Sequence, residues 1–330
     1  MNKKEILILG GTGSLGQTIS KILLENYKLH GLRIFSRDEF KQWKMKNDFK
    51  NKYNQNVSFI LGDVRDKNSL DRAMNRVDII FNAAAMKHVP ACEENPFESV
   101  KTNITGAMNI IDCAIDNKIK TVMHISTDKA VYPINLYGAT KTVAEKIFIF
   151  GNVYTGNHAA NFSVCRYGNV IGSRGSIIPL FLEQGKTGKI TLTDKEMTRF
   201  WISLEQVAKF IIAKAQLAKG GEIYIPKMKS VRIIDIITAM FGDEIKIETI
   251  GIREGEKIHE CLMTEEESFY SYTNDEYIVI NKNLELLKFG YSYLSNKYFE
   301  KLKTGYSYVS NKNIFLTIPE IKKEIQRYTS

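Results

Sequence analysis

The stretch EILILGGTGSLG, residues 5–16, decides the fold of this 330-residue chain. Its apolar start is typical of a short buried strand, and residues 18–24 have helical periodicity. Between them lie Gly10, Gly13 and Gly16, with the spacing GxxGxxG. Such a turn lets the backbone approach a pyrophosphate, whose charge the following helix N-terminus attracts. We therefore interpret the stretch as a dinucleotide-binding turn; the alternative is an ordinary tight turn.

Five more apolar runs continue this pattern. They are residues 32–35, 57–61, 78–81, 121–125 and 161–167, and a helix is expected at 103–117. Strands that alternate with helices predict an α/β fold with a doubly wound parallel sheet. We expect a Rossmann-type nucleotide-binding domain and a smaller, discontinuous C-terminal substrate domain. The expected boundaries are 1–167 with 198–222 for the first domain, and 168–197 with 223–330 for the second.

Composition and net charge limit the classes of protein to which this chain can belong. Hydrophobic residues make up 44% of the chain, which is enough for a sizeable core. The net charge of +9 fits solvated surface lysines, or a partner rich in phosphate. We expect no nucleic-acid binding, because no basic run is interleaved with aromatic residues.

Targeting and redox features indicate a cytoplasmic protein. No apolar run approaches the roughly 18 residues of a membrane span, and the N-terminus does not resemble a signal peptide. The cysteines at positions 92, 113, 165 and 261 lie far apart without a CxxC pair. We expect free thiols in a reducing compartment, and no metal site.

The residues that follow the second predicted strand favour NADP over NAD. NAD-binding folds usually place an acid there, on the ribose 2′-hydroxyl. In this chain Ser36 and Arg37 precede Asp38, with Lys41 nearby. An arginine fork suits a 2′-phosphate; the alternative is a surface Arg–Asp pair. After the third strand, Asp63 is placed to accept a hydrogen bond from the adenine amino group.

The stretch STDKAVYPINLYGATK, residues 126–141, carries the reactive side chains. Tyr137 and Lys141 are four residues apart, so they share one face of a helix. A tyrosine has a pKa of about 10, and its phenolate needs nearby positive charge at neutral pH. We expect Lys141 and an oxidised nicotinamide to supply this charge. Tyr137 then takes a proton from a substrate hydroxyl while hydride leaves the same carbon.

Thr127, Asp128 and Lys129 follow the fifth strand, at the sheet edge where open α/β folds bind ligands. Once a sugar carbon is a ketone, a base can remove the neighbouring proton and an acid can expel a hydroxyl one carbon further on. We expect Asp128 to be the acid, with its pKa raised by burial. We expect Lys129 to be the base, with its pKa lowered by nearby cations. The alternative is a solvent-exposed Asp–Lys pair.

Two further patterns lie downstream. Arg174, Arg199 and Arg253 are expected outside regular elements, over the carboxyl edge of the sheet, where converging guanidinium groups suit a diphosphate. Taken one at a time, each also fits a surface position. The segment GYSYLSNK (290–297) recurs as GYSYVSNK (305–312), which is too short a repeat for a solenoid, and we assign it no function.

These motifs resemble the extended short-chain dehydrogenase/reductase superfamily and, within it, the inverting UDP-N-acetylglucosamine 4,6-dehydratases of pseudaminic acid biosynthesis. The segments that carry the resemblance are GGTGSLG (10–16), FSRDE (35–39), GDVRD (62–66), AAAMKHVP (83–90), STDKAVYPINLYGATK (126–141), RYGNVIGSRGS (166–176), MTRFWIS (197–203), GGEIYIPKM (220–228) and GIREGEKIHE (251–260). Lys129 is specific, because dehydratases that retain the C5 configuration usually carry Asp-Glu here. A capsule-type group lacks the tyrosine that this chain has at position 137.

The resemblance implies a redox-neutral lyase with bound NADP. Hydride leaves C4 of the sugar with help from Tyr137 and Lys141, Lys129 removes the C5 proton, and Asp128 helps to expel the C6 hydroxyl. Hydride then returns to C6, and C5 is reprotonated on the opposite face. The expected cofactor contacts are Gly10, Thr12, Gly13, Ser14, Leu15, Gly16, Ser36, Arg37, Asp38, Lys41, Asp63, Val64, Ala83, Ala84, Lys87, Tyr137 and Lys141. The expected contacts with the UDP-sugar are Lys87, Asn169, Val170, Arg174, Arg199, Arg253 and Glu256.

The resemblance also implies a homo-oligomer, usually a hexamer, that acts on UDP-N-acetylglucosamine away from any membrane. Departures are modest: Val131-Tyr132 is bulkier than usual, and Glu254 replaces a common Pro or Ala. The alternatives are a dehydratase with 5-epimerase activity on another nucleotide sugar, and a non-catalytic NADP-binding regulator. Such regulators typically lose the tyrosine or the lysine, and this chain keeps both.

Overall fold

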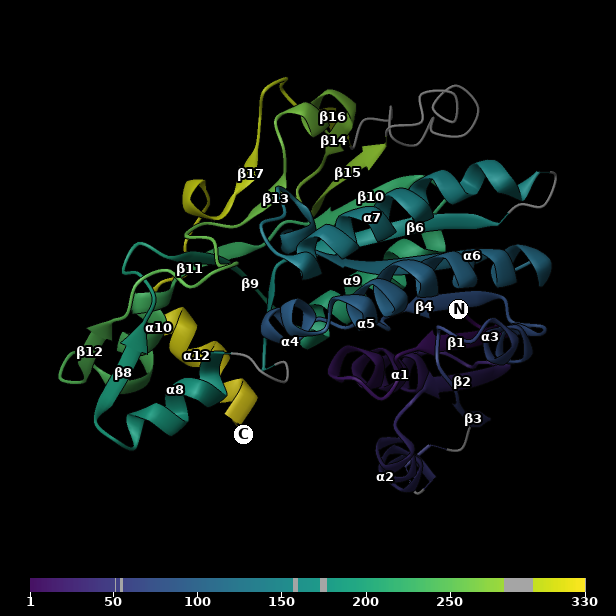
Figure 1. The fold of residues 1–330 in the computed structure, drawn as a ribbon, viewed down its shortest axis with the longest axis horizontal. Helices are drawn as coiled ribbons and strands as arrows, with labels where there is room; N and C mark the ends of the chain where they lie inside the picture. Colours follow the sequence, from purple (N-terminus) through teal and green to yellow (C-terminus); the bar gives the residue numbers. More distant parts are fainter. Residues whose placement is uncertain (51, 54–55, 157–159, 173–176, 282–298, 330) are drawn as a thin grey trace.

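The computed structural model describes residues 1–330 except 51, 54–55, 157–159, 173–176, 282–298 and 330. Its main sheet has the strand order β16-β14-β15-β10-β6-β5-β4-β1-β2-β3 (Figure 1). The strands are β1 (Glu5–Leu9), β2 (Gly31–Ser36), β3 (Val57–Leu61), β4 (Ile79–Asn82), β5 (Thr121–Thr127), β6 (Asn161–Tyr167), β10 (Glu222–Pro226), β14 (Ser271–Thr273), β15 (Tyr277–Asn281) and β16 (Glu300–Lys301). The seven strands from β10 to β3 in this spatial order pair in parallel. The other three strands, β15, β14 and β16, add an antiparallel edge next to β10. The predicted parallel α/β architecture is confirmed.

Helices cover both faces of this sheet. Helix α9 packs against α1 and over β5, β6 and β10, while α7 packs against α6 and over β5 and β6 (Figure 1). The helices are α1 (Ser14–Asn26), α2 (Glu39–Lys50), α3 (Lys67–Met74), α4 (Val89–Glu94), α5 (Pro96–Val100), α6 (Gly106–Asp116), α7 (Leu136–Gly151), α8 (Ile177–Gly185), α9 (Leu204–Leu217), α10 (Ile233–Phe241) and α12 (Ile318–Thr329). None of the helices in the described residues is long and apolar enough to cross a bilayer.

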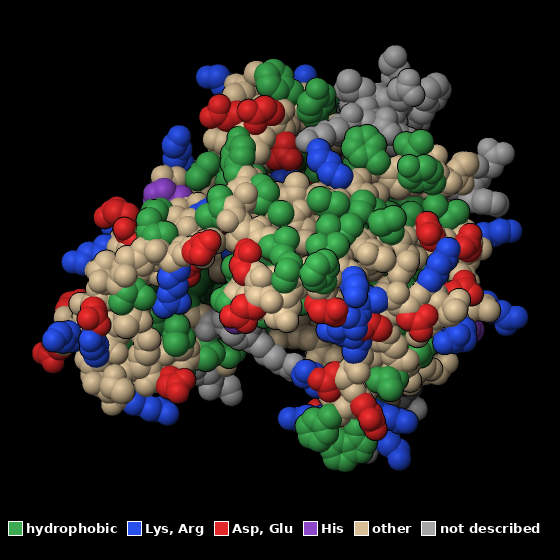
Figure 2. Space-filling model, viewed as in Figure 1, with side chains coloured by type: hydrophobic (Ala, Val, Ile, Leu, Met, Phe, Trp, Pro, Cys, Tyr) green, Lys and Arg blue, Asp and Glu red, His purple; other side chains and the backbone are tan. Residues whose placement is uncertain are grey.

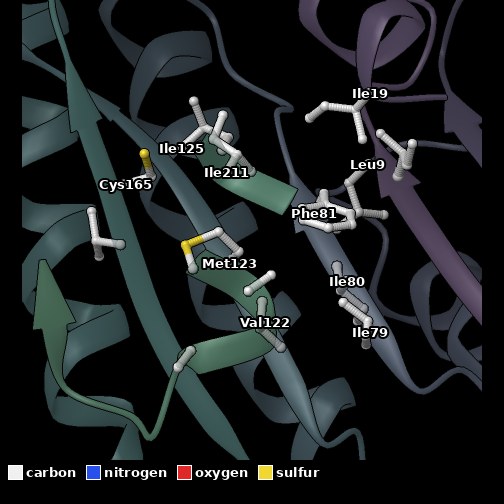
Figure 3. Close-up of a cluster of buried hydrophobic side chains, with 14 of the residues drawn as sticks. Leu9, Ile19, Ile79, Ile80, Phe81, Val122, Met123, Ile125, Cys165 and Ile211 are labelled. Carbon is white, nitrogen blue, oxygen red and sulfur yellow. The ribbon is translucent and has the colours of Figure 1, made fainter. Parts of the chain in front are cut away.

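The central strands are buried because helices cover both of their faces. All five residues of β1 are buried, as expected for a parallel strand between two helical layers. Figure 3 shows Phe81 of β4 and Met123 of β5 in the same apolar cluster as Ile211 of α9. Strand β5 extends two residues beyond its predicted end, because Ser126 and Thr127 remain paired with β6. This extension keeps the segment that precedes Asp128 rigid.

The C-terminal part adds small sheets and a second apolar core. The sheets are β11 (Lys229–Arg232), β9 (Thr198–Ser203) and β7 (Asn169–Ile171); β12 (Lys246–Thr249) and β8 (Lys189–Leu192); and β13 (Cys261–Met263) and β17 (Tyr308–Val309). The second core joins α8, α10 and α12, with Phe181, Ile237 and Ile321 among its buried members. The main sheet also receives β14, β15 and β16 from the C-terminal half, and the predicted domain boundaries stay a prediction.

A buried ion network fixes the helix that carries the reactive tyrosine. Arg166 of β6 donates to Glu145 of α7 and to Glu267, with Nη2 at 2.6 Å from Glu145 Oε2 and Nη1 at 2.9 Å from Glu267 Oε2. Its Nη1 also donates to the Leu262 carbonyl at 2.8 Å. Helix α7 is therefore tied, through Arg166, to residues that follow shortly after Glu260, which lines the cavity described next.

Candidate active site

One cavity of about 1450 Å³ runs along the carboxyl edge of the parallel strands. Figure 2 shows the surface hollowed between the part that carries α8 and α10 and the body of the molecule. Every candidate cofactor, substrate and catalytic residue predicted from the sequence lines this cavity, apart from Arg174, which lies outside the described residues. The structure thus brings together residues that the sequence places far apart.

The glycine turn forms the end of the cavity suited to a pyrophosphate. Gly10 has a φ of +72°, and a Cβ there would lie 2.8 Å from backbone atoms of Ala83. A Cβ on Gly16 would lie 2.6 Å from the Cα of Gly11, so the turn requires glycine at both positions. Helix α1 starts after Gly13 with no side-chain cap and no acid in its first turn. Its first N–H groups are therefore available to an anion, and a dinucleotide fits this end.

Cations surround the position expected for a ribose phosphate. Arg37 Nη1 lies 3.5 Å from Asp63 Oδ2, while Arg65 donates to the same oxygen at 2.7 Å. Burial raises the pKa of Asp63, but the hydrogen bonds from Arg65 lower it more, so this carboxylate stays ionised. Lys41 forms an ion pair with Asp38. Both Arg37 and Lys41 line the cavity.

Tyr137 lies at the start of α7 and is almost fully buried. The helix is capped by Asn135, whose side chain accepts the Gly138 N–H at 2.7 Å. Burial raises the pKa of Tyr137 to about 12, while the charge of Lys129 and a hydrogen bond with Thr127 oppose the rise. We expected Lys141 to supply the positive charge. In the structure the charge of Lys129 acts on Tyr137.

Burial lowers the pKa of Lys141 to about 7. Its Nζ lies 2.9 Å from His124 Nε2 and 2.5 Å from the Ile125 carbonyl oxygen. The Asn82 amide is oriented by the Ala84 N–H, which donates to its Oδ1, so its Nδ2 donates to His124 Nδ1 at 2.9 Å. With Nδ1 accepting, His124 carries its proton on Nε2 and can donate it to the neutral amine form of Lys141. The sequence analysis missed this network.

Replacing Lys141 by Met is expected to stabilise the fold at pH 7, and less so as the pH rises. Between about pH 7 and 10.5 the unfolded chain binds one more proton at Lys141 than the folded chain, so wild-type stability rises with pH. The cost removed at pH 7 is on the order of 4 kcal/mol, less the hydrogen bonds lost to His124 and Ile125. Denaturant unfolding of the variant and of wild type at about pH 7, 8 and 9 measures the difference in their free energies of unfolding. A difference that stays constant with pH would contradict the lowered pKa of Lys141.

Asp128, Lys129 and Glu260 form a group of three ionisable side chains, in which both acids are buried and the lysine is partly buried. Lys129 Nζ lies 3.2 Å from Asp128 Oδ1 and 3.2 Å from Glu260 Oε1. Burial, reinforced by Glu260, raises the pKa of Asp128, as the sequence interpretation required. The prediction that nearby cations lower the pKa of Lys129 was wrong, while its predicted role as the base stays a prediction. Burial lowers its pKa, but the two carboxylates outweigh burial and raise it, so Lys129 is an ammonium in the free protein.

The sequence analysis also missed Glu260. Its carboxylate is 2% exposed, and Lys129, Arg199 and Lys257 together lower its pKa against the opposing effect of burial. The residue closes the segment 251–260 that the resemblance used, but no spacing to Lys129 marks it. Only the fold brings the two together.

The residues predicted to contact a UDP-sugar also line the cavity where the structure describes them. Arg199 was expected outside regular elements, but it lies in β9 and is buried, with Nη1 donating to the carbonyls of Thr198 and Ile258. Glu256 accepts from the Thr193 hydroxyl at 3.0 Å, and Arg253 is exposed on the same loop. Buried polar atoms in the wall that lack a hydrogen-bond partner among the described residues are Ser126 Oγ, Asp128 Oδ2, Asn169 Oδ1, Trp201 Nε1 and Glu260 Oε2. Such atoms suit a polar ligand.

Comparisons with known proteins agree with this geometry. The model of a family described as polysaccharide biosynthesis protein matches residues 6–282. A Campylobacter jejuni (strain 81-176) protein named UDP-N-acetylglucosamine 4,6-dehydratase (inverting) is 47% identical over 290 residues, which cover 87% of this chain and 85% of that protein. A Rickettsia canadensis protein named UDP-glucose 4-epimerase is 41% identical over 271 residues, 80% of this chain and 79% of that one. The solved structure of Pen from Bacillus thuringiensis has a TM-score of 0.90 with 37% identity, and the match covers 99% of this chain and 98% of that one.

Proposed function

The chain belongs to the polysaccharide biosynthesis protein family, and we propose that it is an NADP-dependent UDP-N-acetylglucosamine 4,6-dehydratase that inverts C5. The observation that carries the proposal is the buried group of Asp128, Lys129 and Glu260 beside Tyr137. A 4-epimerase needs the tyrosine to move one proton at C4. A 4,6-dehydratase needs in addition a base for C5 and an acid for the C6 hydroxyl, and this group offers both.

Each reactive side chain has a role in this proposal. Tyr137 accepts the proton of the sugar C4 hydroxyl, and Lys129 accepts the C5 proton. Asp128 gives the proton of its carboxyl group to the C6 hydroxyl, which leaves as water; burial raises the pKa of Asp128 and so favours the protonated form that this step needs. A bound NADP would supply the hydride chemistry at C4 and C6. C5 would then be reprotonated on the opposite face, which gives the inverted product.

The cavity has room for a dinucleotide and a nucleotide sugar together. The glycine turn would hold the pyrophosphate of the cofactor, with Arg37 and Lys41 at its 2′-phosphate. Arg253, Asn169 and Glu256 would contact the UDP-sugar, and Lys87 lies where the two meet. The guanidinium of Arg199 donates to backbone carbonyls and lies 3.8 Å from Glu260, so it would stabilise that carboxylate as well as contact the UDP-sugar.

We further propose that the product is UDP-2-acetamido-2,6-dideoxy-β-L-arabino-hex-4-ulose and that it enters pseudaminic acid biosynthesis, for flagellar or other surface glycans. The protein would be a cytoplasmic homo-oligomer. These finer proposals rest on the resemblance of the segment 126–141 and on the named Campylobacter relative.

Proton NMR of the reaction with UDP-N-acetylglucosamine tests the function. A 4-keto-6-deoxy product with inverted C5 supports it. The C4 epimer would point to an epimerase, as in the Rickettsia name. Both C5 configurations together would indicate an added epimerase activity. No reaction with this sugar but water loss from another would change the substrate, and cofactor binding without any turnover would indicate a regulator.

Replacing Arg37 by Ala is expected to weaken NADP binding more than NAD binding. The guanidinium is about half exposed at the cavity wall, 3.5 Å from Asp63, and only NADP carries a phosphate on the ribose 2′-oxygen. A charge-assisted hydrogen bond is worth roughly 1.5–3 kcal/mol, so the NADP dissociation constant should rise about 10- to 100-fold. Calorimetric titration with both cofactors measures this. Equal losses for NADP and NAD would contradict the preference.

A further inference from the structure

One side chain joins the predicted sugar-binding loop, residues 251–256, to the helix that carries Tyr137. Asn135 is the N-cap of α7, and its Oδ1 accepts the Gly138 N–H at 2.7 Å. Its Nδ2 donates to the Gly255 carbonyl oxygen at 2.8 Å. The two partners fix the orientation of the amide, because an N–H needs the oxygen and a carbonyl needs the nitrogen. Asn135 therefore caps the helix with one atom and holds the loop with the other.

The loop approaches the chain before α7 closely at two points. Gly255 has a φ of +78°, and a Cβ there would lie 3.1 Å from the Cβ of Asn135. Two residues further on, Lys257 Nζ donates to the Val131 carbonyl oxygen at 2.6 Å. Both bonds reach the stretch of chain that separates the predicted C5 base from the reactive tyrosine.

Asn135 lies behind the cavity wall, while the loop that it holds forms part of that wall. Arg253, Gly255 and Glu256 line the cavity, but Asn135 does not. Tyr137 follows two residues after Asn135, in the first turn of α7. A reacting group tolerates little displacement, since a shift of about 1 Å can lower a rate about 10²-fold. Asn135 is thus placed to transmit the position of the loop to Tyr137 without touching a ligand.

We propose that Asn135 is a positioning residue that couples binding of the UDP-sugar at the loop 251–256 to the placement of Tyr137. The proposal rests on the proposed function, which puts the UDP-sugar against this loop. A nucleotide sugar that contacts the loop fixes Gly255, and the Asn135 amide then fixes the first turn of α7. Loss of this tie therefore lowers both the affinity for the nucleotide and the rate of C4 oxidation.

Two substitutions break the tie from its two sides. Asn135→Asp keeps an oxygen for the Gly138 N–H, and aspartate is as good an N-cap as asparagine, but it has no N–H for the Gly255 carbonyl. Gly255→Ala puts a Cβ against Asn135 and strains a positive φ. Each variant therefore separates the loop from α7 and leaves the helix cap in place.

Each substitution has a matched control. Gly251→Ala strains a φ of +84° in the same loop, but its Cβ would meet no atom of the described residues within 4 Å. Asn95→Asp adds the same negative charge at the exposed N-cap of α5. Neither Gly251 nor Asn95 lines the cavity, so both variants should behave like wild type.

The experiment measures ligand binding and C4 oxidation separately. Calorimetric titration gives the dissociation constant of NADP, and that of UDP for the NADP-loaded protein, where UDP binds without turnover. The absorbance of reduced nicotinamide gives the rate of C4 oxidation with saturating UDP-N-acetylglucosamine. This substrate is deuterated at C5, so that NMR also reports whether the C5 hydrogen is then lost.

Asn135→Asp and Gly255→Ala are each expected to raise the UDP dissociation constant about 2- to 12-fold, the effect of one lost hydrogen bond. C4 oxidation at saturation should slow about 10- to 100-fold, because Tyr137 is less well placed. NADP affinity should stay at its wild-type value. The double variant should lose no more than either single variant, since both substitutions break the same contact.

Wild-type UDP affinity and wild-type C4 oxidation in Asn135→Asp would overturn the coupling. Equal losses of NADP and UDP affinity, additive losses in the double variant, or the same losses in Gly251→Ala would also overturn it, since each means a structural effect beyond this tie. A wild-type protein that oxidises C4 but keeps the C5 deuterium would overturn the dehydratase and leave the coupling intact. A wild-type protein that binds UDP but never reduces nicotinamide would overturn both.

Discussion

Replacing Tyr137 by Phe is expected to lower kcat by about 10²- to 10⁴-fold, the contribution of a positioned acid–base group. Without the phenolate no group accepts the proton of the C4 hydroxyl, so the reaction stops before C4 becomes a ketone. Reduced nicotinamide should not appear in a single turnover, and the C5 proton should not exchange. Because the ring is buried and only its hydroxyl is removed, the fold and NADP affinity should change little.

Tyr132→Phe is the matched control for this variant. Tyr132 lies five residues upstream, is 56% exposed, and its hydroxyl donates to Glu266 rather than into the cavity. It should keep wild-type kcat. Full activity of Tyr137→Phe, or normal C4 oxidation with a later block, would contradict the assigned role.

The pKa of Tyr137 adds a pH dependence to the same prediction. Burial raises the pKa to about 12, so the phenolate fraction of the protein without ligands rises about tenfold per pH unit through neutrality. Since the phenolate is the active form, kcat/KM should rise with pH on the alkaline side of pH 7. A bound oxidised nicotinamide lowers the pKa in the complex, so kcat should level off at a lower pH than kcat/KM.

The local features of this site were readable from the sequence. The glycine turn, the strand 5–9 and the YxxxK spacing of Tyr137 and Lys141 each depend on residues a few positions apart, whose geometry follows from helix and strand periods. The end of each parallel strand also predicts which residues share the sheet edge. This is why the candidate residues of the described chain line one cavity.

The protonation states of the site residues could not be predicted from the sequence, because they depend on contacts with distant segments of the chain. Lys129 was expected to lose its proton easily, but Asp128 and Glu260, the second from a distant segment of the chain, stabilise the ammonium. Lys141 was expected to carry the charge, but His124 and burial favour its neutral form. No periodicity relates these pairs. A sequence can therefore name the groups at such a site before the fold reveals which of them holds the proton.

Lys129→Arg is expected to block loss of the C5 proton while leaving C4 oxidation in place. Arginine keeps a cation between Asp128 and Glu260, so neither buried carboxylate loses its partner. Its guanidinium is always charged in proteins and cannot supply the free base. Reduced nicotinamide should therefore accumulate, and C5 deuterium should be retained, with a rate loss of at least about 10³-fold.

Lys129→Met separates the charge of the lysine from its role as base. It also removes the base, but it leaves Asp128 and Glu260 facing each other without a cation, which raises the pKa of both carboxyl groups. The folded chain then binds more protons than the unfolded one above about pH 4, so the stability of this variant should fall as pH rises. Lys129→Arg should show a smaller fall, because the cation that it keeps opposes the rise of both pKa values. Urea unfolding of both variants in a buffer near about pH 5 and in one near about pH 8 measures this contrast in stability. Water loss at the wild-type rate by either variant would show that another group removes the C5 proton.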